Sequence, residues 1–230
     1  MQTTLPFKSL YKTLNIWTWN INCIKNKEHL VYHLLKKHDI DILLLTETKL
    51  MENDDIVLFD GYISLFNSNK TCHYHGVAFI YKNHLNMSLL NYILPHDQVI
   101  DDIEDDIING HYMEGRILVL KCEINHKIII LVGTYVPNSG VNKNHPLKRL
   151  TYRTLSWDKD LYKYLYKLEV EYKHVIWLGD LNVIIKDNDS YHTKTNIAGT
   201  TIEERTNIKE FMVNIGLIRG ILKIRLNHVA

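Results

Sequence analysis

Stretches of apolar residues that end in polar residues recur along the chain, each short enough to be a strand. Residues 14–20 read LNIWTWN, and residues 39–49 read DIDILLLTETK. In the second stretch a continuous apolar run ends at Glu47, which is typical of a strand buried on both faces. Further strands are predicted for residues 76–81, 116–122, 127–135 and 174–179. The last of these ends at Asp180, so polar side chains are expected at the ends of several buried strands.

Three segments with apolar residues at helical spacing alternate with these strands. They are residues 28–38, residues from about 150 to 170, and a segment opened by the capping-box pattern Thr201–Glu204. The apolar positions are Leu30, Val31, Leu34 and Leu35; Trp157, Leu161, Leu165 and Leu168; and Ile208, Phe211, Met212 and Ile215. Strands and helices in mixed order predict a layered sandwich, with sheets inside, helices outside and a functional site at the strand ends. No repeat or linker-like stretch interrupts the chain, which predicts a single domain.

The bulk composition is that of an ordinary globular protein with enough apolar residues for a sizeable core. Hydrophobic residues make up 46% and charged residues 23% of the 230 positions, and the formal net charge is +1. A nearly neutral chain is not expected to coat DNA through charge alone, but it can contact a few phosphates. The cysteines are odd in number and far apart, so neither a disulfide framework nor a cysteine zinc site is expected. Without a secretory or membrane-spanning run, an intracellular location is expected.

Four polar clusters follow predicted strands, and together they suit the hydrolysis of a phosphodiester. They are WNIN with Asn20 and Asn22, TETK with Glu47, TYVPN with Tyr135 and Asn138, and GDLN with Asp180 and Asn182. Taken singly, each cluster also fits a turn, a strand end or a helix cap. As a set, Glu47 and the WNIN asparagines offer oxygen ligands to a hard cation such as Mg²⁺. Asp180 is suited to positioning a water, and the neutral donors are suited to holding phosphate oxygens.

Several other conspicuous residues have structural explanations that we weigh against functional ones. The four tryptophans, Trp17, Trp19, Trp157 and Trp177, lie in apolar strands or on a helix face and are expected in the core. His73 and His75 flank Tyr74 at ligand-like spacing, but 13 histidines make chance proximity the better explanation. The acidic run at residues 101–107 is expected to be a solvated loop. Arg116 fits a structural ion pair and a DNA contact equally well.

The motifs of this chain resemble, in order, those of the exonuclease III-type abasic-site endonucleases, with the eukaryotic branch the nearest. The motifs are WNIN, LTETK, EGR (Glu114–Arg116), TYVPNSG, RLTYRTLSWD (Arg149–Asp158), GDLNV and AGTTIEER (Ala198–Arg205). The resemblance implies an α/β, four-layered sandwich in which two mainly antiparallel or mixed sheets are flanked by helices. It covers residues 14–217, which we take as the domain, with an N-terminal extension at 1–13 and a divergent tail at 218–230.

The same resemblance implies a role for each matching residue. Glu47 corresponds to the principal metal ligand, and Asn20 and Asn22 correspond to neighbouring metal-site positions. The catalytic set is Tyr135, a phosphate contact, Asp180, which activates the water, and Asn182, which stabilises the transition state. The implied DNA contacts are Asn138, Tyr74, Arg116, Arg149 and Arg153.

The chain also departs from the family pattern, most of all near its C-terminus. Cys23, Thr46 and Thr200 stand where relatives usually have glycine, glutamine and an aromatic residue. Relatives continue with a terminal Ser-Asp-His motif that supplies a metal-linked aspartate and the catalytic histidine. Here the sequence diverges after about Ile218, and no aspartate precedes His228. From this pattern we expect an incomplete second half of the sandwich, with reduced activity and stability.

The function implied by the resemblance is an abasic-site endonuclease of base excision repair. The implied cofactor is Mg²⁺, with Mn²⁺ as an alternative, and the implied partner is duplex DNA containing abasic sites. We expect a monomer without a membrane or an obligate protein partner. The expected compartment is the nucleus in a eukaryote, with the cytoplasm or mitochondrion as alternatives. Exonuclease (3′ to 5′) and 3′-phosphodiesterase activities are further implied.

Two other functions remain open at the level of sequence. One is another phosphoesterase of the same fold, such as a retroelement endonuclease or a phospholipid or inositol phosphatase. The segments RLTYRTLSWD and AGTTIEER argue against this alternative, because they mark the abasic branch. The other is a non-catalytic remnant, which the missing Ser-Asp-His motif favours.

Overall fold

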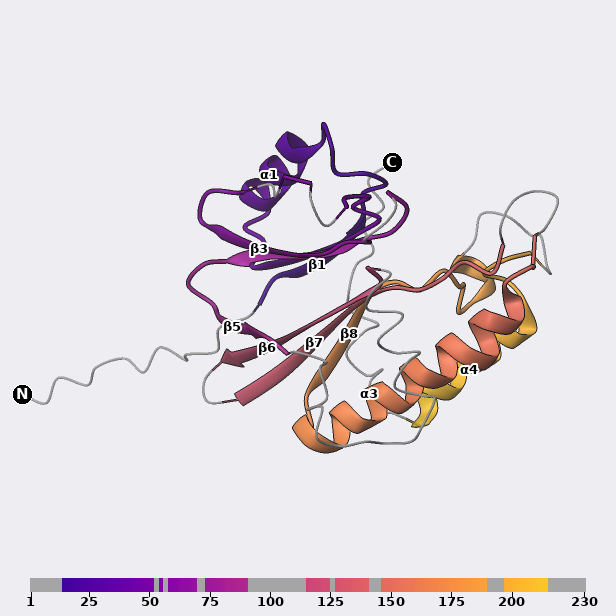
Figure 1. Cartoon of the computed structure of the whole chain (residues 1–230). Coiled ribbons are helices and arrows are strands. Elements are labelled where there is room, and N and C mark those ends of the chain that lie inside the picture. Colours follow the sequence, from indigo (N-terminus) through magenta and orange to yellow (C-terminus); the bar gives the residue numbers. More distant parts are fainter. Residues whose placement is uncertain are drawn as a thin grey trace, which may run out of the picture.

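The computed structural model describes most of the chain between residues 14 and 214. The described ranges are residues 14–51, 54–55, 58–69, 73–90, 115–124, 127–140, 146–189 and 197–214. They form two four-stranded sheets with helices on their outer faces (Figure 1). Within these ranges, none of the helices combines the length and the apolar character that crossing a bilayer requires.

The first sheet comes from the N-terminal part of the chain and has the strand order β1-β2-β4-β3. Its elements are β1 (Ile16–Asn20), α1 (Glu28–Lys37), β2 (Ile42–Thr46), β3 (Tyr62–Asn67) and β4 (Val77–Lys82). Strands β1 and β2 are parallel and are connected through α1, whereas β4 is antiparallel to both β2 and β3. The carboxyl ends of β1 and β2 therefore lie next to each other, with Asn20 opposite Thr46.

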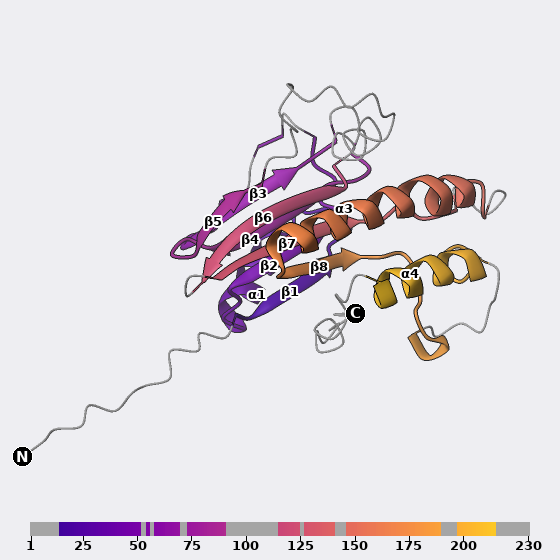
Figure 2. The same cartoon turned by 90° about the horizontal axis from the view of Figure 1, so that it is seen from below.

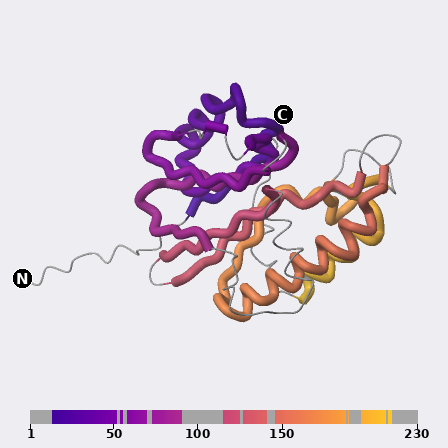
Figure 3. Tube along the Cα trace, viewed as in Figure 1, coloured from indigo at the N-terminus to yellow at the C-terminus, as the bar shows by residue number. Residues whose placement is uncertain are grey.

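The second sheet has the strand order β5-β6-β7-β8 and is built by the later part of the chain (Figure 3). Its strands are β5 (Asn86–Leu89), β6 (Ile117–Ile124), β7 (Lys127–Tyr135) and β8 (Val175–Asp180). A π-helical segment η1 (Tyr152–Trp157) and helix α3 (Asp158–Tyr172) connect the parallel strands β7 and β8. A short 3₁₀ turn η2 (Asp187–Asp189) and helix α4 (Ile202–Asn214) follow.

Three apolar clusters define four layers. One cluster lies between α1 and the first sheet, a second lies between the two sheets, and a third lies between the second sheet and α3 and α4. Helices α3 and α4 lie side by side on the outer face of the second sheet in both views (Figures 1 and 2). The apolar run of β2 is continuous because both faces of the strand are buried. Leu43 and Leu45 face α1, and Ile42 and Leu44 face the other sheet.

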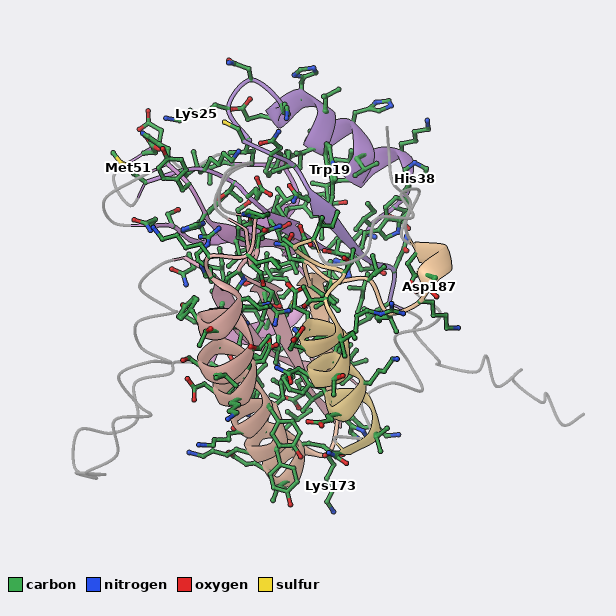
Figure 4. All side chains as sticks on the ribbon, turned by 90° about the vertical axis from the view of Figure 1, so that its right-hand side faces the viewer. Trp19, Lys25, His38, Met51, Lys173 and Asp187 are labelled. Atoms are coloured by element: carbon green, nitrogen blue, oxygen red, sulfur yellow. The ribbon has the colours of Figure 1, made fainter. Side chains whose placement is uncertain are left out.

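The structure confirms the predicted fold class of two mixed sheets flanked by helices. The tryptophans are core residues as predicted: Trp157 and Trp177 are buried, and Trp17 and Trp19 pack partly buried under α1 (Figure 4 labels Trp19). Strands β3 and β5 were not predicted; both lie at sheet edges, and most of their residues are half-buried or exposed. The π-helical opening of α3 was also not predicted.

Candidate active site

Three of the predicted site residues form one hydrogen-bonded group at the edge where the two sheets meet. The Asn20 Nδ2 atom donates to Oε1 of Glu47 and to Oδ2 of Asp180, at 2.8 Å in each case. Asn20 and Asp180 are 160 positions apart in the sequence. The group forms because β1 and β2 end side by side in the first sheet, and β8 of the second sheet packs against both of them, so that its end meets theirs.

The backbone at two of these strand ends adopts conformations that few residues favour. Glu47 has φ of 54° and Asn182 has φ of 47°, both in the left-handed region. Gly179 has φ of 135°, and a Cβ atom there would collide with the carbonyl oxygen of Thr134 on the neighbouring strand β7. Such positions concentrate at functional sites, where the surrounding structure holds them in place. The GDLN turn therefore needs glycine directly before Asp180.

The Glu47 carboxylate is held in its ionised form. Its burial would raise its pKa, but hydrogen bonds from Asn20, Tyr135 and Lys49, together with the charge of Lys49, lower that pKa below 4.5. The Tyr135 hydroxyl donates to Glu47 Oε1 at 3.1 Å. Burial, followed by the negative charge of Glu47, raises the Tyr135 pKa above its usual 10, so the phenol stays neutral. At neutral pH the site thus holds an anionic carboxylate beside an uncharged hydroxyl donor.

Lys49 was not singled out from the sequence, although it belongs to the TETK motif. Its Nζ atom lies 3.3 Å from Glu47 Oε2 and 2.5 Å from Asn22 Oδ1. It therefore occupies the amide oxygen that was predicted to help hold a metal, and it balances part of the charge of Glu47. The signal available in the sequence was its spacing, two residues after the carboxylate on the turn that follows β2.

Asn138 and Asn182 lie together beside this group. The Asn182 backbone N–H donates to Asp180 Oδ1 at 3.0 Å, and its Nδ2 atom donates to the Val136 carbonyl at 2.7 Å. Asn138 Nδ2 is 3.5 Å from Asn182 Oδ1, and Asn138 Oδ1 accepts the Gly140 N–H at 2.7 Å. Two side-chain amides are thus held next to the carboxylates, in an arrangement suited to contacting an anionic group.

The donor set fits a hard cation of the magnesium type. Two carboxylates, Glu47 and Asp180, are joined through one amide group, and Mg²⁺ is commonly held by one or two carboxylates with water and substrate oxygens. Among the described residues, no cluster of three or more His, Cys, Asp or Glu side chains has the spacing to hold a metal ion. An Mg²⁺ ion at this edge would therefore depend on amide oxygens, water or substrate in addition to the two carboxylates.

Tyr74 lies at the rim and is 71% exposed, so its predicted DNA contact stays a prediction. Behind it, the Arg116 side chain is only 3% exposed. Arg116 donates to the Tyr135 carbonyl at 3.2 Å and lies 3.0 Å from His75 Nε2. Burial, with the charges of Arg116 and Arg149, lowers the His75 pKa to about 4, so His75 is neutral. The burial of Arg116 and its hydrogen bond to the Tyr135 carbonyl argue against its predicted DNA contact.

The two arginines of the RLTYRTLSWD motif have different environments. Arg149 is partly exposed, and its Nε atom donates to the Gly140 carbonyl at 3.2 Å, so its DNA contact stays a prediction. Arg153 is fully buried and paired with Asp158. This burial argues against the predicted DNA contact of Arg153. Sequence could not separate the two residues, since both are arginines one helical turn apart.

Other predictions fall on residues outside the described ranges. They concern the N-terminal extension, Cys72, the acidic run at 101–107, Glu114, and the tail with Ile218 and His228. The capping box lies inside the described ranges and is confirmed. Thr201 Oγ1 accepts the Glu204 N–H at 3.3 Å, and Glu204 Oε2 accepts the Thr201 N–H at 3.2 Å.

Comparison with known proteins identifies relatives over most of the chain. The endonuclease/exonuclease/phosphatase family matches residues 17–209. A Dictyostelium discoideum DNA-(apurinic or apyrimidinic site) endonuclease is 33% identical over 204 residues, 86% of this chain and 50% of the relative. A Bacillus subtilis exodeoxyribonuclease is 28% identical, over 86% of this chain and 71% of the relative. The crystal structure of an AP endonuclease from Leishmania major superposes with a TM-score of 0.67 at 27% identity, covering 86% of this chain and 64% of that one.

This chain thus spans half the length of the Dictyostelium relative and under two thirds of the Leishmania structure. The likeness also extends to proteins of other activity. The endonuclease domain of a telomere-specific retrotransposon superposes with a TM-score of 0.51 at 12% identity, which shows a shared fold alone.

Proposed function

The chain belongs to the endonuclease/exonuclease/phosphatase family, and we propose that within it the protein is an abasic-site DNA endonuclease. The proposed reaction is hydrolysis of the phosphodiester on the 5′ side of an abasic site in duplex DNA, which leaves a 3′-hydroxyl and a 5′-deoxyribose phosphate. The observation that carries the proposal is the Glu47–Asn20–Asp180 group, with Tyr135 donating to Glu47. Relatives named as endonucleases of apurinic or apyrimidinic sites support the choice of substrate.

In the proposed reaction, Asp180 acts on the attacking water, and other residues of the site contact the phosphate. Asp180 is fixed by the Asn20 amide and the Asn182 N–H, which leaves its carboxylate suited to orienting a water and accepting its proton. Asn138 and Asn182 are suited to donating to non-bridging phosphate oxygens, where negative charge grows in the transition state. Tyr135 is neutral and adds a further donor without a permanent charge.

Glu47 and Asn20 would hold the cation, with Asn22 as a neighbouring oxygen donor. A bound Mg²⁺, or Mn²⁺ in its place, supplies positive charge to the phosphate oxygens during hydrolysis. Lys49 contributes a positive charge of the chain's own at the outer side of Glu47, at 3.3 Å. We further propose that the protein is a monomeric enzyme of base excision repair. It would act where duplex DNA is found, which in a eukaryotic cell is the nucleus.

Incision of a labelled duplex with one tetrahydrofuran abasic analogue tests the proposal. We expect cleavage 5′ to the analogue in Mg²⁺, none in EDTA, and a loss of at least about 100-fold in Glu47→Gln, in line with removal of one central catalytic group. Glu203→Gln is the matched control, because Glu203 is exposed in the first turn of α4 and lies outside the site group. Equal incision by Glu47→Gln and the wild-type protein would contradict the assigned site.

The exodeoxyribonuclease among the relatives favours a second activity of the same site. We propose that the chain also removes 3′-terminal nucleotides or 3′-blocking phosphate groups, because the same residues can hold a terminal phosphodiester. A nicked duplex with a 3′-phosphate and one with a 3′-hydroxyl distinguish these reactions. Both should lose activity with Glu47→Gln if one site serves all of them.

A further inference from the structure

The loop that carries Asn138 is bound by two arginines, one in the turn before η1 and one within η1. Arg149 donates to the Gly140 carbonyl, and Arg153, four residues later, donates through Nε to the Pro137 carbonyl at 3.1 Å. Asn138 therefore lies between two carbonyl groups that are each bound by a guanidinium. Both arginines lie where the chain enters the π-helical segment η1, a type of turn that occurs often at functional sites.

Arg153 also reaches the loop that carries the other amide. The Nη2 atom of Arg153 donates to the carbonyl of Leu181, the residue directly before Asn182, at 3.0 Å. Its third nitrogen pairs with Asp158, and the side chain is fully buried. A single planar group thus connects the residue before Asn138, the residue before Asn182 and a carboxylate on α3. Because a guanidinium donates in fixed directions, it sets the distance between the two carbonyls that it binds.

A second buried ionisable side chain, Glu204, binds the residue on the other side of Asn138. Ser139, directly after Asn138, donates to Glu204 Oε1 at 2.5 Å. Glu204 is fully buried, and its other oxygen accepts the N–H groups of Gly199 and Thr201 at the start of α4. Asn138 is thus flanked on both sides by residues bound to buried ionisable side chains, one from each outer helix.

We propose that Arg153 is a positioning residue that sets the spacing and orientation of Asn138 and Asn182 without touching the substrate. The inference rests on the proposed function, because it assigns these two amides to the phosphate. Lysine cannot replace arginine in this role: one ammonium nitrogen cannot reach three acceptors that lie on different sides of a planar fork. Displacing catalytic groups by about 1 Å lowers rates by about 100-fold, which sets the scale of the expected effect.

The first test measures the free protein and needs no activity. Hydrogen exchange followed by mass spectrometry should be faster in Arg153→Lys than in the wild type over residues 136–140 and 181–183, and unchanged in β2 and β4. The matched control is Arg205→Lys: Arg205 also pairs with an aspartate, Asp187 (labelled in Figure 4), and reaches the Ile185 carbonyl. Unchanged exchange over both loops in Arg153→Lys would overturn the proposal.

A measurement on the wild-type protein covers the case in which Arg153→Lys does not fold. The Nε–H of Arg153 donates to a buried carbonyl and should exchange slowly with water, seen by NMR as a persistent arginine signal. Free arginine added to the same buffer provides the fast-exchange reference. Rapid exchange of the Arg153 Nε–H would overturn the assigned hydrogen bond, and with it the proposal.

The second test separates positioning from general loss of structure. In abasic-site incision, Arg153→Lys should lower kcat by about 10- to 100-fold while KM for DNA changes by less than about twofold. In an Asn182→Ala background the same substitution should cost less than in the wild type, because one of the two amides that Arg153 positions is already gone. An equal loss in both backgrounds would overturn the proposal. If the wild type does not incise abasic DNA, the proposed function fails, and hydrogen exchange still decides the role of Arg153.

Discussion

Gly133 lies where the two sheets approach closely, and we predict that Gly133→Ala destabilises the fold. Gly133 lies in β7, between Leu118 of β6 and Leu178 of β8, both of which face the core between the sheets. A Cβ atom on Gly133 would lie 2.6 Å from Leu44 Cδ1 and 2.8 Å from Phe79 Cε2 on the opposite sheet. The absence of a side chain therefore makes room for Phe79 and Leu44.

The size of the effect follows from these contacts. Ordinary carbon contacts begin near 3.4 Å, so Leu44 would have to move by roughly 0.8 Å, although neither it nor Phe79 has any exposed surface. Overpacking of this kind costs about 1–3 kcal/mol, and the lower entropy of the unfolded alanine chain offsets about 0.4–1 kcal/mol of it. We expect a net loss of about 1–2 kcal/mol and a fall in Tm of about 2–8 °C.

Urea and thermal unfolding followed by circular dichroism measure the change. The second-site variant Leu44→Val removes the closest contact, so Gly133→Ala should cost at least about 0.5 kcal/mol less in that background than in the wild type. An unchanged unfolding midpoint in Gly133→Ala would refute the reasoning. So would equal costs in both backgrounds, because the penalty would then not arise from the contact across the sheets.

Further predictions concern the site carboxylate and the start of α4. Because the pKa of Glu47 lies below 4.5, its charge and its contribution to stability are present above that pH and are lost as the pH falls through its folded-state pKa. Calorimetric Mg²⁺ titration should therefore show Glu47-dependent affinity that is retained at pH 5.5 in the wild type. In Tyr135→Phe the loss of affinity should begin at a higher pH than in the wild type, because one of the hydrogen bonds that lower the Glu47 pKa is gone. Equal pH profiles would contradict this. Thr201→Ala should lower the unfolding free energy by about 1 kcal/mol, because Glu204 loses its capping partner. Thr206→Ala, at an exposed position within α4, is the control, and the prediction fails if both variants lose the same stability.

Much of the site could be predicted from strand ends alone. Apolar runs that stop at Asn20, Glu47 and Asp180 indicate three strands that end in polar residues. The parallel pair β1–β2 brings two of these ends together, and the packing of the two sheets brings the end of β8 to them. The same local patterns predicted the helices, because 3.6-residue periodicity and the Thr201–Glu204 capping box are properties of neighbouring residues. Roles in catalysis are different: they stay predictions, because hydrogen bonds in a free protein do not report on a reaction.

The arginines show what only the tertiary structure could decide. Arg116, Arg149 and Arg153 are alike in sequence, yet one is partly exposed and two are buried beneath the site loops. The environment of each depends on contacts between segments that are distant in the chain, such as Arg153 with the carbonyls of Pro137 and Leu181. Periodicity records which face of an element is apolar, and it holds no information about which loops a long polar side chain will reach. The sequence therefore determined the layers and the strand ends, whereas packing determined which charged residues stay partly exposed and which are buried beneath the site loops.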